Sequence, residues 1–230
     1  MRRGNLGRAL ALLAGVVLVS CTEAPISSLN NAQVTPTVQR DNTPSGDVHL
    51  VISQVYGAGG NSGSTLKNDY IEIFNPTGTA VKVDGWSVQY QSSAGTGSMQ
   101  VTNLSGVVQP GRYYLVQESQ GSGGSLSLPT PDATGSISMS GTNGKVVLAK
   151  TTTAYTGLCA SDANVVDEVS FGPSSTGSGS ATASNLTATT AATRSGAGCT
   201  NTGVTSADFT NVTAAPRNSA TTRILARPRL

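Results

Sequence analysis

The sequence predicts an all-β protein of the sandwich or barrel type, and three observations carry this prediction. Charged residues make up only 11% of the chain, which disfavours a bundle of long charged helices. Glycine is frequent, at 27 of 230 residues, and separates short runs rich in Val, Thr and Tyr, which favour strands. No stretch keeps the three-to-four spacing of apolar residues that a long helix requires. The length suits one domain of ordinary size with its own core.

The individual strands are predicted from alternation between turn signals. Trp86, Val88 and Tyr90 alternate with polar residues, so they face one side of a half-buried strand. Asn75-Pro76 and Asp84-Gly85 are turn signals that follow or separate such runs. The runs expected to form strands are 48–55, 70–74, 81–83, 86–91, 112–116, 145–149 and 165–171.

Residues 1–20 are expected to be a signal peptide. Three arginines among the first eight residues precede an unbroken run of apolar residues and glycine over 9–19. That run is too short to cross a bilayer, which takes about 20 residues. It ends in Leu18-Val19-Ser20-Cys21, which resembles the lipobox of bacterial lipoproteins. The resemblance implies that the chain is cut before Cys21 and that its thiol carries a diacylglyceryl anchor. A plain secretory peptide with an incidental cysteine is the alternative.

Residues 21–46 are predicted to form a disordered tether. They are rich in Ser, Thr, Asn, Gln and Pro and have no apolar period, so ordering them would not be compensated by burial. The tether would hold a folded domain over 47–222 away from the bilayer, and residues 223–230 would form a basic tail. Thr22 stands where an Asp would resemble an inner-membrane retention signal. We therefore expect an exported lipoprotein of the outer membrane or cell surface.

Two cysteines remain after lipidation, Cys159 and Cys199. An even count outside the cytoplasm suggests a disulfide between them, and a pair of buried free thiols is the alternative. Residues 172–198 between them are rich in Ser, Thr, Gly and Ala and weakly patterned. We expect a long surface excursion there, pinned near its end by Cys199.

The charge balance argues against nucleic acid as the partner. Without the three arginines of the signal peptide, the chain has 11 Lys and Arg against 12 Asp and Glu. Three of those 11 basic residues lie in the C-terminal tail, so the folded part is mildly acidic. Binding to phosphates requires clustered positive charge.

The motifs of known catalytic sites are missing. A single histidine, His49, leaves a Ser/His/Asp triad without support, and no Gly-x-Ser-x-Gly elbow occurs. Asp69 and Glu72 are three apart on one predicted strand, so they should point to opposite faces. The loop 57–63 fails the Gly-x-Gly-x-x-Gly spacing, because position 62 is Ser, and we expect a flexible hairpin loop there. The sequence therefore predicts a protein that is not an enzyme and has no resident cofactor.

Calcium is the ligand hypothesis with the most support. Calcium takes six to eight oxygen ligands from carboxylates and carbonyls. Asp69, Asp132 and Asp162 are loop or strand-end residues that would supply some of these oxygens. No Asp-x-Asp-x-Asp-Gly run accompanies them.

The chain contains, in this order, Ile52-Ser53, 69–76 (DYIEIFNP), 84–86 (DGW), 110–113 (PGRY), 144–148 (GKVVL) and 165–167 (VVD). Their order and spacing resemble the bacterial lamin tail domain, as does the end of the chain from Cys199 to Asn218. The resemblance covers 47–222 and implies an immunoglobulin-like β-sandwich with a long Ser/Thr/Gly-rich excursion. Gln54 departs from the family, whose members often have an acidic residue after Ile-Ser, so an acidic role at this position is not expected here.

These observations lead to one leading functional hypothesis and two others. We expect a lipid-anchored, extracytoplasmic, non-enzymatic module that is held to the membrane by its lipid. It would present a sandwich face or an edge strand to a protein or glycan partner in the cell envelope. The alternative is a nucleic-acid-associated accessory domain, because bacterial relatives of the lamin tail domain often accompany extracellular nucleases or phosphatases. A hydrolase without familiar motifs is the third hypothesis.

Overall fold

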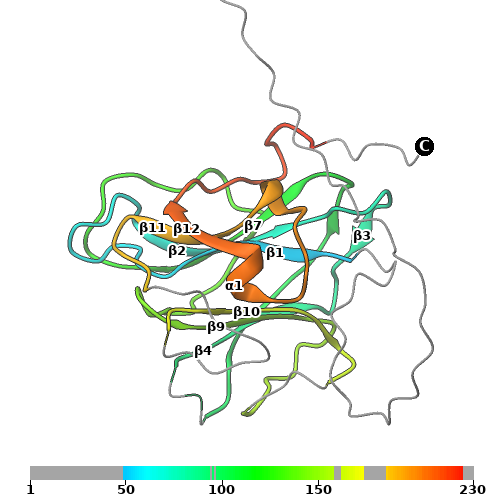
Figure 1. Ribbon diagram of the computed structural model, residues 1–230, viewed down its shortest axis with the longest axis horizontal. Helices are drawn as coiled ribbons and strands as arrows, with labels where there is room; N and C mark the ends of the chain where they lie inside the picture. Colours follow the sequence, from blue (N-terminus) through cyan, green and yellow to red (C-terminus); the bar gives the residue numbers. More distant parts are fainter. Residues whose placement is uncertain (1–48, 94, 96, 158–161, 174–184, 225–230) are drawn as a thin grey trace, which may run out of the picture.

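The fold is a β-sandwich of two stacked sheets with a small third sheet at one end. A computed structural model describes residues 49–93, 95, 97–157, 162–173 and 185–224. Figure 1 shows the larger sheet as the upper layer and the smaller sheet as the lower layer. Within these residues the helical structure consists of the four-residue α1 (Thr205–Asp208) and the 3-10 turn η1 (Gly196–Gly198). The prediction of an all-β, immunoglobulin-like sandwich is confirmed.

The larger sheet has six strands in the order β12-β11-β1-β2-β7-β8. All neighbours are antiparallel except β7 and β8, which pair in parallel. The strands are β1 (Val51–Tyr56), β2 (Asn68–Phe74), β7 (Tyr113–Gln120), β8 (Ala133–Thr134), β11 (Thr190–Arg194) and β12 (Phe209–Thr213).

The smaller sheet has four antiparallel strands in the order β10-β9-β4-β5. These strands are β4 (Ser87–Gln91), β5 (Gln100–Asn103), β9 (Gly144–Ala149) and β10 (Val165–Phe171). A separate two-stranded sheet joins β3 (Val81–Lys82) to β6 (Val107–Val108). None of the helices in the described part of the chain is long and apolar enough to cross a membrane.

The core lies between the two sheets and follows from the two-residue period of the strands. Ile71 and Ile73 of β2 and Val146 and Leu148 of β9 are completely buried in one cluster. The alternate residues of β2 and β7 point to the outer face of the larger sheet, where Tyr56, Tyr70 and Leu115 form a second cluster under the surrounding loops. The larger sheet is therefore covered on both faces.

A β-bulge in β1 breaks this alternation at one place. The pairing with β2 changes register between Ile52, which faces Ile73, and Gln54, which faces Glu72. The extra residue is Ser53, so Ser53 and Gln54 both reach Glu72 instead of pointing to opposite faces. The bulge thus brings two adjacent polar side chains onto one side of the strand.

The structure differs from the predicted surface excursion over residues 172–198. Residues 190–194 form β11, which lies inside the larger sheet between β1 and β12. The prediction of a surface excursion is wrong for this part. Ala191 and Ala192 are small enough to pack on both faces of a covered strand, so β11 lacks the Val-rich or aromatic signal of its neighbours. The short strands β5, β6, β8 and β12 were also not among the predicted runs.

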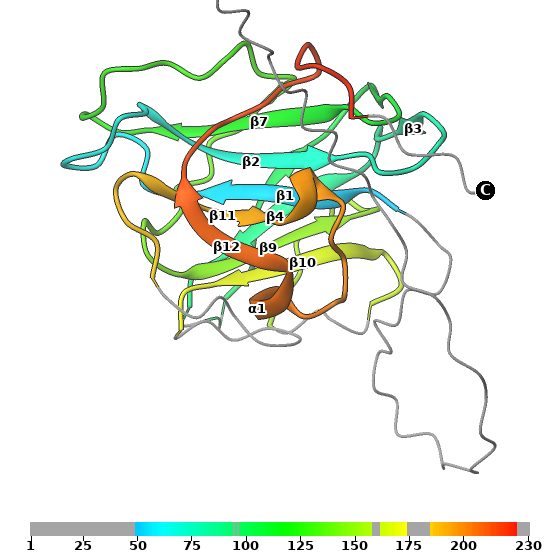
Figure 2. The same ribbon diagram turned by 45° about the horizontal axis from the view of Figure 1, so that its top comes forward.

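The chain after β12 crosses the outer face of the larger sheet, and we call residues 214–224 the strap. Ala215 bonds to Gln54 of β1, Arg217 bonds to Glu72 of β2, and Ile224 donates its backbone N–H to Gly111 before β7. Figure 2 shows this segment, in red, passing from β12 over β1 and β2 toward β7. These contacts extend two residues beyond the predicted domain boundary at 222.

Candidate functional site

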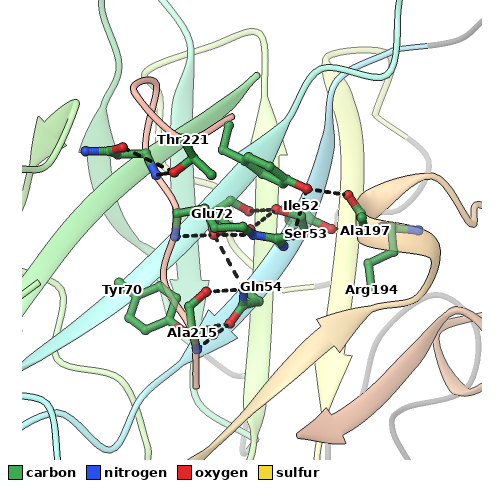
Figure 3. A network of polar contacts seen from close by, with 12 residues as sticks. Ile52, Ser53, Gln54, Tyr70, Glu72, Arg194, Ala197, Ala215 and Thr221 are labelled. Carbon is green, nitrogen blue, oxygen red and sulfur yellow. Dashed lines mark hydrogen bonds and ion pairs between the residues drawn. The ribbon is translucent and has the colours of Figure 1, made fainter. Parts of the chain in front are cut away.

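A polar network centred on Glu72 lies on the outer face of the larger sheet, under the strap (Figure 3). The Glu72 side chain is completely buried. Arg217 donates to its carboxylate through Nε and Nη2, at 3.2 and 2.7 Å, and through its backbone N–H at 2.7 Å. Ser53 adds a hydroxyl hydrogen bond of 2.5 Å. A charged group without solvent is tolerable only with such complete pairing.

The second half of the network fastens the strap to β1 and β7. Gln54 donates to the Ala215 carbonyl at 2.9 Å and accepts the Tyr70 hydroxyl at 2.7 Å. The Arg217 guanidinium lies 3.8 Å from the centre of the Tyr113 ring and donates to the Tyr113 hydroxyl. Gln54 therefore holds the strap by neutral hydrogen bonds.

The electrostatics of this network follow from burial. Burial raises the pKa of the Glu72 carboxyl, and the adjacent Arg217 opposes this shift. Burial also raises the pKa of Tyr113 to about 12. Both Glu72 oxygens accept hydrogen bonds from the protein itself, so the arrangement serves to hold the strap down and offers no free base.

A shallow groove of about 320 Å³ lies beside this network, between the strap and β12. The Thr193 hydroxyl is buried there without a hydrogen-bond partner among the described residues, and the Arg217 side chain is 22% exposed. The groove is lined by Gln54, Thr193, Val212, Thr213, Ala215, Pro216 and Arg217. Val212, Ala215 and Pro216 give the groove an apolar floor, and Gln54, Thr193, Thr213 and Arg217 contribute polar groups to it.

Two further carboxylates are buried inside the sandwich. Asp69 follows the core-facing alternation of Ile71 and Ile73, and Glu118 continues that of β7. Asp69 accepts the backbone N–H groups of Gly59 and Met139, at 2.8 and 2.9 Å. Burial raises its pKa to about 6. The prediction that Asp69 and Glu72 point to opposite faces is confirmed.

Glu118 has fewer partners than Asp69. It is 1% exposed and accepts one backbone N–H, from Ile137 at 2.9 Å. Its second oxygen has no hydrogen-bond partner among the described residues. Burial raises its pKa to about 7, and the nearby Asp69 adds to this shift. This environment favours the neutral carboxylic acid.

A buried arginine joins the two sheets near the β12 edge of the larger sheet. Arg194 of β11 is 2% exposed and forms ion pairs with Asp167 of β10 at 2.6 Å and with Asp208 of α1 at 3.3 Å. Its Nε donates to the Ile52 carbonyl at 2.8 Å, and its guanidinium lies over the Phe209 ring. These contacts tie the end of the chain to both sheets.

The residues predicted to form sites are distributed over the molecule. Cys21 and Cys159 lie outside the described residues, so lipidation and the disulfide stay predictions. Cys199 follows η1 and packs beside Val51, Phe74 and Tyr113.

The calcium candidates have separate roles. Asp69 lies inside the sandwich, and Asp132 accepts hydrogen bonds from the backbone N–H of Leu115 and from Ser219 of the strap. Asp162 accepts the backbone N–H of Asn164 in a local turn. Across the described ranges, no three His, Cys, Asp or Glu side chains gather as metal ligands. The structure does not bring the three aspartates together.

We therefore expect no heat of calcium binding when the chelator-treated protein is titrated with calcium in a calorimeter. The melting temperature should also stay unchanged by added calcium. A saturable heat signal that disappears in Asp69→Asn would contradict this expectation and would place calcium beside that carboxylate.

Sequence reasoning missed Glu118, Arg194 and Arg217 as the residues that organise the polar network. Each has a partner far away along the chain, Ile137 for Glu118, Ile52 for Arg194 and Glu72 for Arg217, so no local spacing reveals these contacts. One signal was available: Glu118 and Glu72 interrupt strands that are otherwise rich in aromatic and aliphatic residues. A charged residue in a covered strand needs a partner.

The chain is similar to the crystal structure of a DUF4876 family protein from Bacteroides thetaiotaomicron, at 14% sequence identity and a TM-score of 0.37. The match covers 54% of this chain and 53% of that chain, so the chain spans about half the length of this neighbour. No curated protein matches the chain.

The family comparison covers the sandwich itself. The sequence model of the family described as Lamin Tail Domain matches residues 43–173. This region runs from before β1 to the end of β10 and amounts to more than half of the 230 residues. The segments that follow it, β11, β12 and the strap, complete the larger sheet and close its outer face. The chain therefore belongs to the lamin tail domain family.

Proposed function

We propose that this protein is a lipid-anchored, extracytoplasmic binding module without enzymatic activity, which presents its lamin tail domain to a partner in the cell envelope. A structural or binding role is the functional class that family membership suggests. The lipid anchor and the export are supported by the signal sequence and by Cys21 in its four-residue box. The partner would be a protein or a glycan.

The observation that carries this proposal is that the buried carboxylates are bonded to other segments of the domain. Glu72 is held by Arg217 and Ser53, and Asp69 by two backbone N–H groups. Each of these groups fastens one segment of the domain to another. A general acid or base has to reach a substrate proton instead. Their geometry therefore supports a rigid binding module in which these acids hold the structure and do not transfer protons.

Metabolic labelling with an alkyne analogue of palmitate tests the anchor. The native chain should take up the label and sediment with membranes, because several acyl chains hold a protein stably in a bilayer. Cys21→Ser should abolish both, whereas Thr22→Ala, which leaves the box intact, should retain both. A native chain that is unlabelled and soluble in the extracellular fraction would overturn the anchor.

Assays of the purified protein on nuclease, phosphatase and peptidase substrates test the second half of the proposal. We expect no turnover above that of a mock purification. Turnover that is lost in Asp69→Asn or Glu72→Gln, while the melting profile shows a folded protein, would show that a buried acid does chemistry and would overturn the proposal.

A further inference from the structure

The two ends of the described chain meet at one end of the sandwich. Ile224 of the strap packs with Val51, Phe74 and Tyr113, at the start of β1, the end of β2 and the start of β7. The chain toward Cys21 leaves from His49, next to the start of β1. On the proposed function, the tether joins the domain at this end of the sandwich. The opposite end, about 20–25 Å away along strands of six to eight residues, is therefore clear of the tether.

Two loops cover this opposite end and are bonded to each other. They are residues 57–67, between β1 and β2, and residues 121–131, between β7 and β8, and we call them the tip loops. Figures 1 and 2 show both, in cyan and green, extending from the same end of the larger sheet, away from the C-terminus. Gly123 donates its N–H to Gly60 at 2.7 Å, and Leu66 and Leu126 form a parallel bridge.

Glycines allow this close approach of two backbones. A Cβ on Gly60 would overlap the backbone of Gly121, and a Cβ on Gly124 would overlap that of Leu66. Gly60 and Gly124 also have positive φ values of 68° and 75°. The loop 57–63, which the sequence predicts to be flexible, is held by these hydrogen bonds as one half of a tied double loop. A surface that is held in place before binding loses less entropy when it binds.

A small polar pocket opens between the tip loops and the segment that follows β8. Its volume is about 90 Å³. The Asp69 carboxylate lies in it, held by its two backbone hydrogen bonds. The lining residues are Gly57, Gly59, Asn61, Asp69, Ser119, Gln120, Gly121, Ser138 and Met139. Amide, hydroxyl and carboxylate groups therefore converge there, with both donors and acceptors.

The composition of the tip loops limits the class of partner. Residues 57–67 and 121–131 contain one charged residue, Lys67, and the acidic Asp132 completes the second loop before β8, so an anionic polymer finds no basic cluster. They contain no aromatic residue, arginine or methionine, the usual anchors of protein interfaces, and their exposed large apolar residue is Leu126. What the surface offers is Ser, Thr, Asn and backbone N–H groups, which bind hydroxyl-rich, uncharged molecules.

We propose that the tip loops and their polar pocket form a binding site for a neutral glycan of the cell envelope. This inference rests on the proposed function for its orientation and deepens it by naming the partner class. The pocket has room for a few water molecules, so it takes one substituent, such as a hydroxymethyl or acetamido group. The rest of the sugar chain would lie across the hydroxyl- and amide-rich loops.

Titration calorimetry of the lipidated full chain in detergent micelles tests this site. The probes are the six-unit oligomers of N-acetylglucosamine and of glucose, with heparin as the anionic comparison. We expect saturable binding of at least one neutral oligomer, with an affinity that changes less than twofold between about 50 and 500 mM salt. Binding of heparin alone, with a steep salt dependence, would overturn the proposal.

Matched variants locate the binding. Asn61 and Gln120 are exposed pocket residues, so alanine at either position should leave the fold intact and weaken binding at least tenfold. Asn103→Ala and Gln109→Ala change the same residue types at exposed positions outside the pocket and should leave binding unchanged. Equal affinities in all four variants, or no binding of either oligomer, would overturn the glycan site. The labelling of Cys21 is measured separately, so a missing anchor and a missing glycan site are distinguishable.

Discussion

Arg217→Ala will lower the free energy of unfolding by about 3–5 kcal/mol at pH 8, because it leaves the completely buried Glu72 carboxylate without its counter-charge. The same change removes the contact with the Tyr113 ring. Urea denaturation followed by circular dichroism measures this loss. The loss should be smaller at pH 5, since burial without Arg217 raises the pKa of Glu72 further and the carboxyl becomes neutral in acid.

Two further variants separate the buried pair from a general effect of removing a cation. Lys82→Ala breaks an ion pair with Asp84 in which the two side chains are 74% and 46% exposed, so it should cost less than about 0.5 kcal/mol. Glu72→Gln combined with Arg217→Ala should recover part of the loss, because no charge remains buried. If the double variant had a lower free energy of unfolding than Arg217→Ala alone, the buried-charge explanation would fail.

Glu118→Gln will raise the free energy of unfolding at pH 8 by about 2–3 kcal/mol and will leave it nearly unchanged at pH 4.5. Burial raises the pKa of Glu118 from 4.5 to about 7 in the folded protein. The contribution of protonated Glu118 to the free energy of unfolding is therefore fully present below pH 4.5. It is lost as the pH rises through about 7 and the buried carboxyl ionises. Glutamine keeps the acceptor for the Ile137 N–H and does not ionise.

The measurement is the slope of the unfolding free energy against pH between 5 and 7.5. The native protein should lose stability across this window, and Glu118→Gln should flatten most of the slope. Asp69, whose pKa is raised to about 6, supplies a residual slope at the lower end. Asp84→Asn is the control: this exposed carboxyl has a lowered pKa and titrates below the window. A variant slope equal to the native slope would mean that Glu118 does not ionise here.

Local pattern was sufficient for the strands that carry the core. Runs such as 70–74, 145–149 and 165–171 combine alternation with β-branched and aromatic residues, and they form β2, β9 and β10. Strand β11 escaped prediction, because its Thr and Ala residues have no strong period of their own. It becomes a strand because β1 and β12 supply hydrogen-bond partners on both sides.

In the candidate sites too, local pattern predicted the direction of a side chain but not its distant partners. Alternation along β2 correctly separated Asp69 from Glu72, since two residues three apart on a regular strand face opposite ways. It did not indicate that Arg217, 145 residues later, would cover Glu72. It also did not indicate that two glycine-rich loops would be bonded together above Asp69.

The sequence by itself determined the all-β class, the positions of the main strands and the membership of the family, because these depend on residue period and on short motifs. The sequence is also the basis for proposing that Cys21 carries the lipid anchor. Only the tertiary structure decided the partners of the buried charges, the place of β11 and the double loop at the far end of the sandwich. These depend on contacts between distant segments, whose energies arise only when the chain is folded and water is excluded.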